Sequence, residues 1–74
     1  MAASCKNYDL QSRFGEYIVG TASELTKLPT TKRGGTDELK GYSPCINGSE
    51  CVVLKPSLAV YFLDGETDTW IQRS

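Results

Sequence analysis

The sequence predicts a small, mainly β domain, with a small α+β arrangement as the alternative. From Cys45 onward, short apolar runs are rich in β-branched and aromatic residues, which is typical of strands. Turn-forming residues separate these runs, and the helical signal upstream covers only a turn or two. We therefore expect a three-stranded antiparallel meander at residues 50–72, an N-terminal strand near 13–20 and one or two short helical turns.

The chain has 74 residues, which is enough for one small domain. A domain of this size buries only about 60% of the surface that its unfolded chain exposes. Its core is expected to supply only about 3–5 kcal/mol, so a partner often completes such a domain. Residues 1–12 are polar and lack any period, which predicts a flexible N-terminal arm. Residues 13–74 then form a single small β-rich domain.

The segment "RFGEYIVG", residues 13–20, predicts the first strand. It contains four apolar residues, three of them between two glycines, and a run of this length and composition suits a short strand. We expect Phe14 and Ile18 to belong to the core.

The next segment, "TASELTKLPT", predicts one or two helical turns at residues 22–28. Thr21 and Glu24 have the spacing of a capping box, and the proline after the segment stops the helix. Such turns would dock Leu25 and Leu28 onto the core. A plain extended loop is the alternative.

Residues 30–44 contain the highest density of turn formers in the chain and predict a long loop. Only Leu39 and Tyr42 could anchor this loop, and "TDELK" is compatible with one helical turn. Loops of this length in compact domains are often functional or disordered. If a flexible surface recognises a partner, this loop is the first candidate.

The segments "ECVVLK", "LAVYFLD" and "TWIQ" predict the three strands of the meander. The run "SLAVYFL" is almost continuously apolar, as in a strand with both faces covered, so we place it at the centre of the meander. Its second face would be covered by residues 13–28 or by another subunit. The expected core residues of the meander are Val52, Val60, Phe62 and Trp70.

The turn "DGETD" between the last two strands is compatible with two registers. A five-residue loop sets Phe62 opposite Trp70 and Tyr61 opposite Ile71. A tighter turn sets Leu63 opposite Trp70 instead. Each such cross-strand pair adds about 0.2–1 kcal/mol, and in either register the single tryptophan closes the last strand.

The acids of this turn do not predict a site. Asp64, Glu66 and Asp68 alternate like the start of a calcium loop, but the glycine comes too early and the chain ends too soon for the last ligand. A glycosidase pair needs one carboxyl group in an apolar cleft, and a hairpin tip is solvated. We expect these acids to keep the turn soluble.

The three cysteines, Cys5, Cys45 and Cys51, predict neither a metal site nor a nucleophile. The chain has no histidine to complete a zinc site or to act as the base for a thiol. No phosphate-binding loop or serine elbow is present. We expect a protein without enzymatic activity or cofactor. Cys45 and Cys51 could close a small disulfide loop, whereas assembly inside a cell would keep both thiols reduced.

The charge pattern gives no reason to expect nucleic acid or membrane partners. Eight basic residues are balanced by nine acidic ones, and the only basic cluster, at Lys32 and Arg33, is too small for either surface. No apolar run approaches the roughly 20 residues of a transmembrane helix, and the N-terminus lacks the apolar core of a signal peptide. We expect a soluble protein.

The segment "LAVYFLDGETDTWIQ" resembles a short module of bacteriophage virion proteins. In that module a strand of the type "lYvwdG" leads through a short turn into "tWv" near the chain end. Upstream, "TASELTKLPT" resembles a "t-x-x-e-L-x-x-LPt" segment, and "CINGSECVVLKP" resembles the "x-x-G-s-x-x-v-v" strand that follows it. The resemblance covers residues 18–73. The turn here is longer than the usual "dGtkW", and the 30–44 insertion is enlarged.

The resemblance implies a virion structural protein, such as a head decoration, head fibre or tail-associated component. Its partners would be its own copies and a capsid or tail protein, bound through many weak contacts, and it would be made in the bacterial cytoplasm and located in the virion. The alternative is a small carbohydrate-binding module in which Tyr42, Tyr61 or Trp70 stacks on a sugar. A secreted disulfide protein is a third, weaker alternative. Burial of Trp70 discriminates against the sugar platform.

Overall fold

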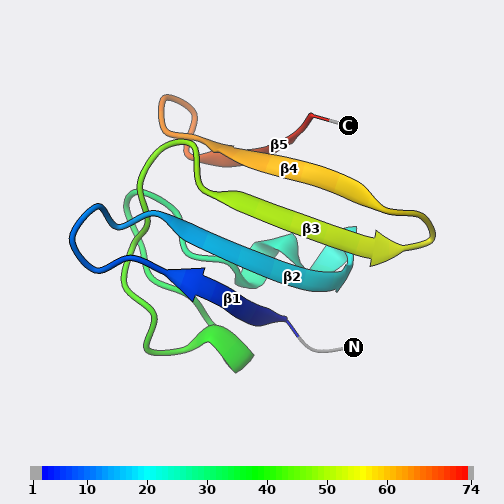
Figure 1. Cartoon of the computed structure of the whole chain (residues 1–74), viewed down its shortest axis with the longest axis horizontal. Coiled ribbons are helices and arrows are strands. Elements are labelled where there is room, and N and C mark those ends of the chain that lie inside the picture. The colour runs from blue at the N-terminus through cyan, green and yellow to red at the C-terminus, as the bar shows by residue number, and fades with distance from the viewer. Residues whose placement is uncertain (1–2, 74) are drawn as a thin grey trace.

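The computed structural model describes residues 3–73. It is mainly β, as predicted, with a single five-stranded sheet in the order β1-β2-β3-β4-β5 (Figure 1). The strands are β1 (Ser4–Tyr8), β2 (Gly15–Thr21), β3 (Glu50–Lys55), β4 (Ala59–Asp64) and β5 (Thr69–Gln72).

The predicted meander is confirmed, because β3, β4 and β5 pair antiparallel in sequence order, with β4 at the centre of the three. The predicted strand near 13–20 is confirmed as β2. In the last hairpin Leu63 lies opposite Trp70, which is the register of the tighter turn. That turn is possible because Asp68 adopts a left-handed backbone conformation, with φ of 59°.

The prediction of a flexible arm at residues 1–12 is wrong for residues 4–8. Residues 4–8 form β1, which pairs antiparallel with β2 and contains a register shift between Cys5 and Asn7. Residues 1–2 lie outside the described part of the chain. The strand is difficult to recognise because it lies at the sheet edge, and its burial pattern leaves most of its side chains in solvent.

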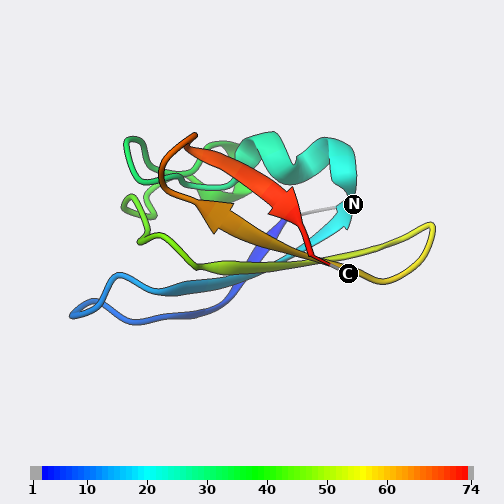
Figure 2. The same ribbon diagram turned by 90° about the horizontal axis from the view of Figure 1, so that it is seen from above.

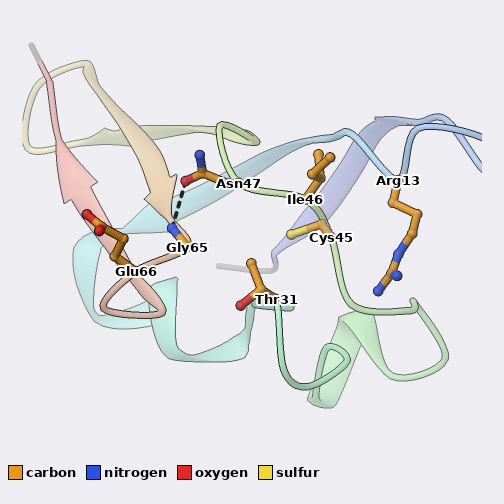
Figure 3. Close-up of a pocket in the computed structure, with 7 residues that line it drawn as sticks. All are labelled: Arg13, Thr31, Cys45, Ile46, Asn47, Gly65 and Glu66. Atoms are coloured by element: carbon orange, nitrogen blue, oxygen red, sulfur yellow. Dashed lines mark hydrogen bonds between the residues drawn. The ribbon is translucent and has the colours of Figure 1, made fainter.

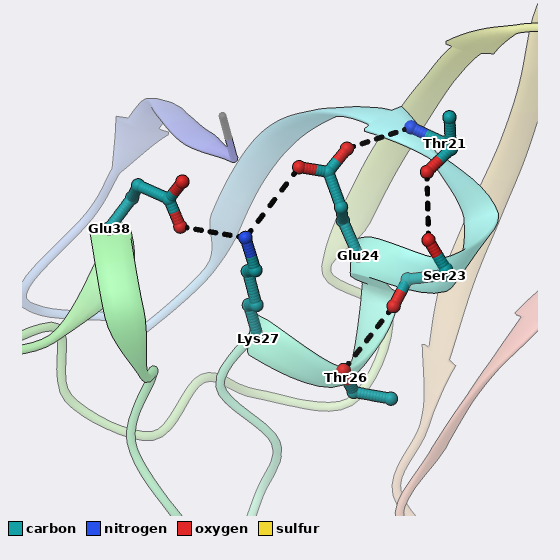
Figure 4. Close-up of polar contacts among 6 residues, drawn as sticks. All are labelled: Thr21, Ser23, Glu24, Thr26, Lys27 and Glu38. Carbon is teal, nitrogen blue, oxygen red and sulfur yellow. Dashed lines mark hydrogen bonds and ion pairs between the residues drawn. The ribbon is translucent and has the colours of Figure 1, made fainter. Parts of the chain in front are cut away.

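Strands β2 and β3 pair in parallel, and residues 22–49 connect them across one face of the sheet. The connection contains two 3-10 segments, η1 (Ala22–Lys27) and η2 (Asp37–Leu39). These confirm the helical turns expected at 22–28 and within "TDELK". The capping box is also present, and the Glu24 carboxylate accepts the Thr21 N–H at 2.9 Å (Figure 4).

The core lies between the sheet and this connection, on the side that we call the covered face. Figure 2 shows the sheet edge-on, with both 3-10 segments on that side. The sheet contributes alternate residues and the connection contributes apolar side chains that meet them, as expected for one-sided burial. The buried hydrophobic residues are Ala3, Tyr17, Val19, Leu28, Leu39, Cys45, Cys51, Val53 and Leu63.

The predicted core was largely assigned to the wrong face of the strands. Leu28 is buried as expected, and Leu25 and Trp70 pack against the core while remaining partly exposed. The other five predicted core residues are only half-buried and do not belong to the core. They are Phe14, Ile18, Val52, Val60 and Phe62.

The physical reason for this error is that both faces of the central strands carry apolar residues. Apart from two glycines, the buried positions of β2 are Tyr17 and Val19, and those of β3 are Cys51 and Val53. Adjacent positions point to opposite faces of a strand. When both the odd-numbered and the even-numbered positions of a strand are apolar, its sequence therefore does not reveal which face the rest of the chain covers.

Candidate functional site

The face of the sheet opposite the covered face carries a group of neighbouring apolar side chains. We call it the outer face and define it by six residues of β2 to β5, whose alternation places them opposite the buried positions. The register brings Ile18, Val52 and Val60 into one row across β2, β3 and β4, and Phe62 and Ile71 into another. The outer face consists of Ile18, Val52, Leu54, Val60, Phe62 and Ile71.

This surface is accessible. Leu54 is 38% exposed and Ile71 is 44% exposed, and Leu58, which follows the β3–β4 turn, is 72% exposed. Figure 1 looks onto the strands from this side, with η1 behind them, and Figure 2 shows that no segment of residues 3–73 lies over it. Apolar surface gathered in this way is typical of a site that binds another molecule.

Charged residues border the outer face: acidic side chains lie on β2 and β3, and a basic side chain lies just after β5. Glu16 and Glu50 are neighbours on the parallel strands β2 and β3, and like charges in such positions repel. The guanidinium carbon of Arg73 lies 5.3 Å from the ring centre of Phe62, which is a cation–π contact. The surface therefore has an acidic pair on one side and a cation on the other.

Trp70, a predicted contact residue, is bound to the rest of the domain on the covered face. Its ring meets that of Tyr17 edge-to-face, with centres 6.1 Å apart and an interplanar angle of 89°. Its Nε1–H donates to the Pro29 carbonyl at 3.2 Å. The indole thus ties β5 to the connection between β2 and β3.

The two other predicted contact aromatics have different environments. Tyr61 packs against the core, and its hydroxyl donates to the Gln72 Oε1 at 3.4 Å. Tyr42 is 38% exposed in the long loop, where its carbonyl accepts the Gly35 N–H at 3.1 Å. The structure does not bring the three aromatic rings onto one open platform.

Cys45 and Cys51, for which a small disulfide loop and reduced thiols were both open, are not bonded, and all three cysteines are free. The Asn47-Gly48 turn between them binds the β4–β5 hairpin instead of closing on itself. The Asn47 Oδ1 accepts the Gly65 N–H at 2.7 Å, and Gly48 N–H donates to the Leu63 carbonyl at 2.9 Å. Cys45 is left facing Pro29, to whose carbonyl its thiol donates at 3.5 Å.

The three thiols are poor nucleophiles. Burial raises the pKa of Cys45, and burial raises the pKa of Cys51 to about 12. The pKa of Cys5 is also raised, again mainly by burial. All three are therefore protonated at neutral pH, and the thiolate is the reactive form.

A groove of about 470 Å³ opens on the covered side, between Arg13, the 45–47 segment and the hairpin tip (Figure 3). Two of its polar side chains are bonded within the chain. The Arg13 guanidinium donates from two nitrogens to the Pro44 carbonyl, each at 3.3 Å, and the Asn47 amide oxygen is occupied by Gly65 N–H. These bonds occupy the Arg13 guanidinium and the Asn47 amide oxygen, while the Glu66 carboxylate also lines the groove.

Two of the three hairpin acids accept hydrogen bonds from the chain. The Asp64 Oδ1 accepts the Glu66 N–H at 3.0 Å, and the Asp68 Oδ1 accepts both the N–H and the hydroxyl of Thr31. These bonds, the hydroxyl first, lower the pKa of Asp68. Among residues 3–73, no three histidine, cysteine or acidic side chains gather as metal ligands would.

Two buried polar residues were missed by the sequence reasoning. Ser49 is fully buried, where its hydroxyl accepts the Gly15 N–H at 3.1 Å and donates to the Ile46 carbonyl at 2.8 Å. The Tyr17 hydroxyl is buried and lacks a hydrogen-bond partner within the described residues. The glycine two residues before Tyr17 is the available signal, since a Cβ at Gly15 would overlap that hydroxyl.

Comparison with known proteins finds no family model, no curated protein and no solved structure that matches the chain. Within residues 3–73, no helix is both long and apolar enough to cross a membrane.

Proposed function

We propose that this chain is a non-enzymatic structural protein of a bacteriophage virion, acting through protein–protein contacts with a capsid or tail lattice. The observation that carries the proposal is the outer face. The outer surface of the twisted sheet, with exposed Leu54 and Ile71, offers apolar area bordered by charged side chains, and such surfaces suit protein partners better than small molecules.

The chemistry of the remaining surface supports a role without catalysis. Catalytic groups need a perturbed pKa matched to proton transfer, or an activated nucleophile. Here the thiols are held protonated, and Asp68 is a structural acceptor with a lowered pKa. In the groove beside Arg13, the guanidinium and the Asn47 amide oxygen are bonded within the chain.

The resemblance to virion proteins supports the finer part of the proposal. The residues that carry it, "LAVYFLDGETDTWIQ", span β4 and β5. A lattice presents many equivalent sites, so that weak contacts made by each small copy add up to stable attachment.

A carbohydrate-binding role is the weaker candidate. A sugar platform needs an aromatic ring with a free face and a free edge. The edge of Trp70 is bonded to Pro29 and its ring packs on Tyr17, while Tyr61 packs against the core. Tyr42 alone would remain as a stacking surface.

The direct test is the composition of purified particles. Virions of the phage that carries this coding sequence should contain the chain at a constant copy number relative to the major capsid protein, measured by quantitative mass spectrometry. Absence from gradient-purified virions, with the chain abundant in infected cells, contradicts the proposal. In parallel, a glycan array should give the same background signal for the wild type and for Tyr42→Ala; binding lost in Tyr42→Ala would favour the carbohydrate role.

A further inference from the structure

We propose that two copies of this chain pack back to back through their outer faces as a symmetric dimer. The inference deepens the proposed function, on which it rests, by naming the partner of the outer face. A dimer of this kind would cover the apolar residues that the connection leaves bare. It would also leave the long loop of each copy facing outward, so that one dimer could bind two lattice sites.

The dimensions of the molecule fit such an interface. The molecule measures 32 × 23 × 18 Å, and Figure 1, viewed down the shortest axis, shows the sheet spread across the two longer dimensions. A stable interface covers about 800 Å² of each partner. The chain has an accessible surface of 4433 Å², so an interface of that size would cover about a fifth of it.

The rows of apolar residues on the outer face can match those of a second copy that is related by a two-fold axis. If the axis runs along the strands between β3 and β4, it carries β3 of one copy over β4 of the other. Val52 then meets Val60 of the second copy, and these residues are already neighbours within one sheet. Aligned sheets of this kind pack with their strands within about 30° of each other.

The charges agree with the same arrangement. The axis brings Glu50 of one copy over Phe62 of the other, whose ring lies beneath Arg73. Within residues 3–73, neither Glu16 nor Glu50 takes part in a salt bridge. Each acidic pair would therefore gain a cation from the second copy, and opposite potentials across an interface fix its register. This complementarity favours a second copy over an unrelated apolar partner.

The first test compares two matched substitutions. Ile71 on the outer face and Ile46 in the covered-side loop are similarly exposed, at 44% and 46%. Analytical ultracentrifugation of the full chain should show a monomer–dimer equilibrium. Ile71→Arg should raise the dimer Kd at least about tenfold, because it places an unpaired charge in the interface. Ile46→Arg should leave the Kd unchanged, and circular dichroism establishes that both variants fold.

The second test exchanges the charges. Glu50→Arg and Arg73→Glu should each weaken the dimer, and the double variant should regain affinity close to that of the wild type. A monomer at every concentration up to about 1 mM, or an equal effect of the two isoleucine variants, overturns the proposal. So does a double variant that is weaker than both single ones.

The failure of this inference is distinguishable from failure of the proposed function. A chain that is monomeric in the ultracentrifuge but present in virions refutes the dimer alone. A dimeric chain that is absent from virions refutes the virion role alone.

Discussion

At the residue scale, Trp70 is the side chain whose separate contacts can be measured one at a time. Trp70→Phe keeps an aromatic ring against Tyr17 but loses the N–H that donates to Pro29. We expect it to lower the free energy of unfolding by about 1 kcal/mol, and Trp70→Ala to lower it by about 3 kcal/mol or more. Urea unfolding followed by circular dichroism measures both values. Equal losses for the two variants would mean that the hydrogen bond, and not the ring, holds β5.

Asp68 should make part of the stability depend on pH. Its folded pKa is lowered, chiefly by the Thr31 hydroxyl, so its contribution is fully present above its unfolded pKa of about 3.9. The contribution is lost as pH falls through the lower folded pKa. The difference in unfolding free energy between the wild type and Asp68→Asn should therefore be constant from pH 7 to 5 and shrink below pH 4. A difference that stays constant down to pH 2 would contradict this assignment.

The contrast between Trp70 and Ser49 shows what a sequence reveals about single residues. The single tryptophan, at the end of an apolar hairpin, is predictable as the residue that closes β5, and it does pack against the core. Ser49 looks like an ordinary turn residue after Asn47-Gly48, and its bond to Gly15 depends on a partner far away in the chain. The local sequence pattern identifies a large side chain that packs in the core. It does not identify a small polar side chain whose role is to bond a backbone N–H far away in the sequence.

At the scale of elements, four of the five strands and both helical turns follow from composition and turn signals. Turn residues delimit β3, β4 and β5, and glycines delimit β2. β1 was missed because an edge strand needs only a few inward residues, here Cys5 and Tyr8. The face of the sheet that is buried could not be predicted, because both the odd-numbered and the even-numbered positions of β3 include apolar residues.

Ser49 offers a test of how the elements are joined. Ser49→Ala leaves the buried Gly15 N–H without its acceptor at the start of β2. A buried donor without a partner costs about 1–3 kcal/mol, and we expect a loss of that size in the free energy of unfolding. Ser43→Ala, at an exposed position of the long loop, is the control and should be neutral. A neutral Ser49→Ala would mean that water or a shifted loop replaces the hydroxyl.

At the scale of the whole molecule, β1 is an integral part of the fold. A chain that begins at residue 9 lacks Ala3 and Cys5, which pack in or against the core, and the Tyr8 hydroxyl that donates to Pro44 at 3.1 Å. We expect its free energy of unfolding to fall by about 3 kcal/mol, measured by thermal and urea unfolding. Leu10→Ala, at the 82% exposed turn, should have no effect. Unchanged stability of the shortened chain would instead restore the flexible-arm interpretation.

The sheet order itself could not be derived from the sequence. The meander follows from short turns, but the parallel pairing of β2 with β3 depends on a long connection crossing the sheet. Nothing local in residues 22–49 specifies which strand the connection returns to. The bare outer face follows from the same fact, because a single connection covers only one side of a sheet.

The parallel pairing of β2 with β3 also determines the order of events when the chain folds. Gly15 and Ser49 are bonded across 34 positions, so the chain must close a long loop before this contact forms. Hairpins such as β4–β5 form in about 1–10 μs, whereas sheets that rely on distant pairing take milliseconds to seconds. During synthesis β1 and β2 emerge first and can pair with each other, but the other edge of β2 has no partner until β3 has been made. The newly made chain therefore exposes an unpaired strand edge throughout this interval. We expect aggregation to begin then, when the exposed edges of neighbouring nascent chains contact each other.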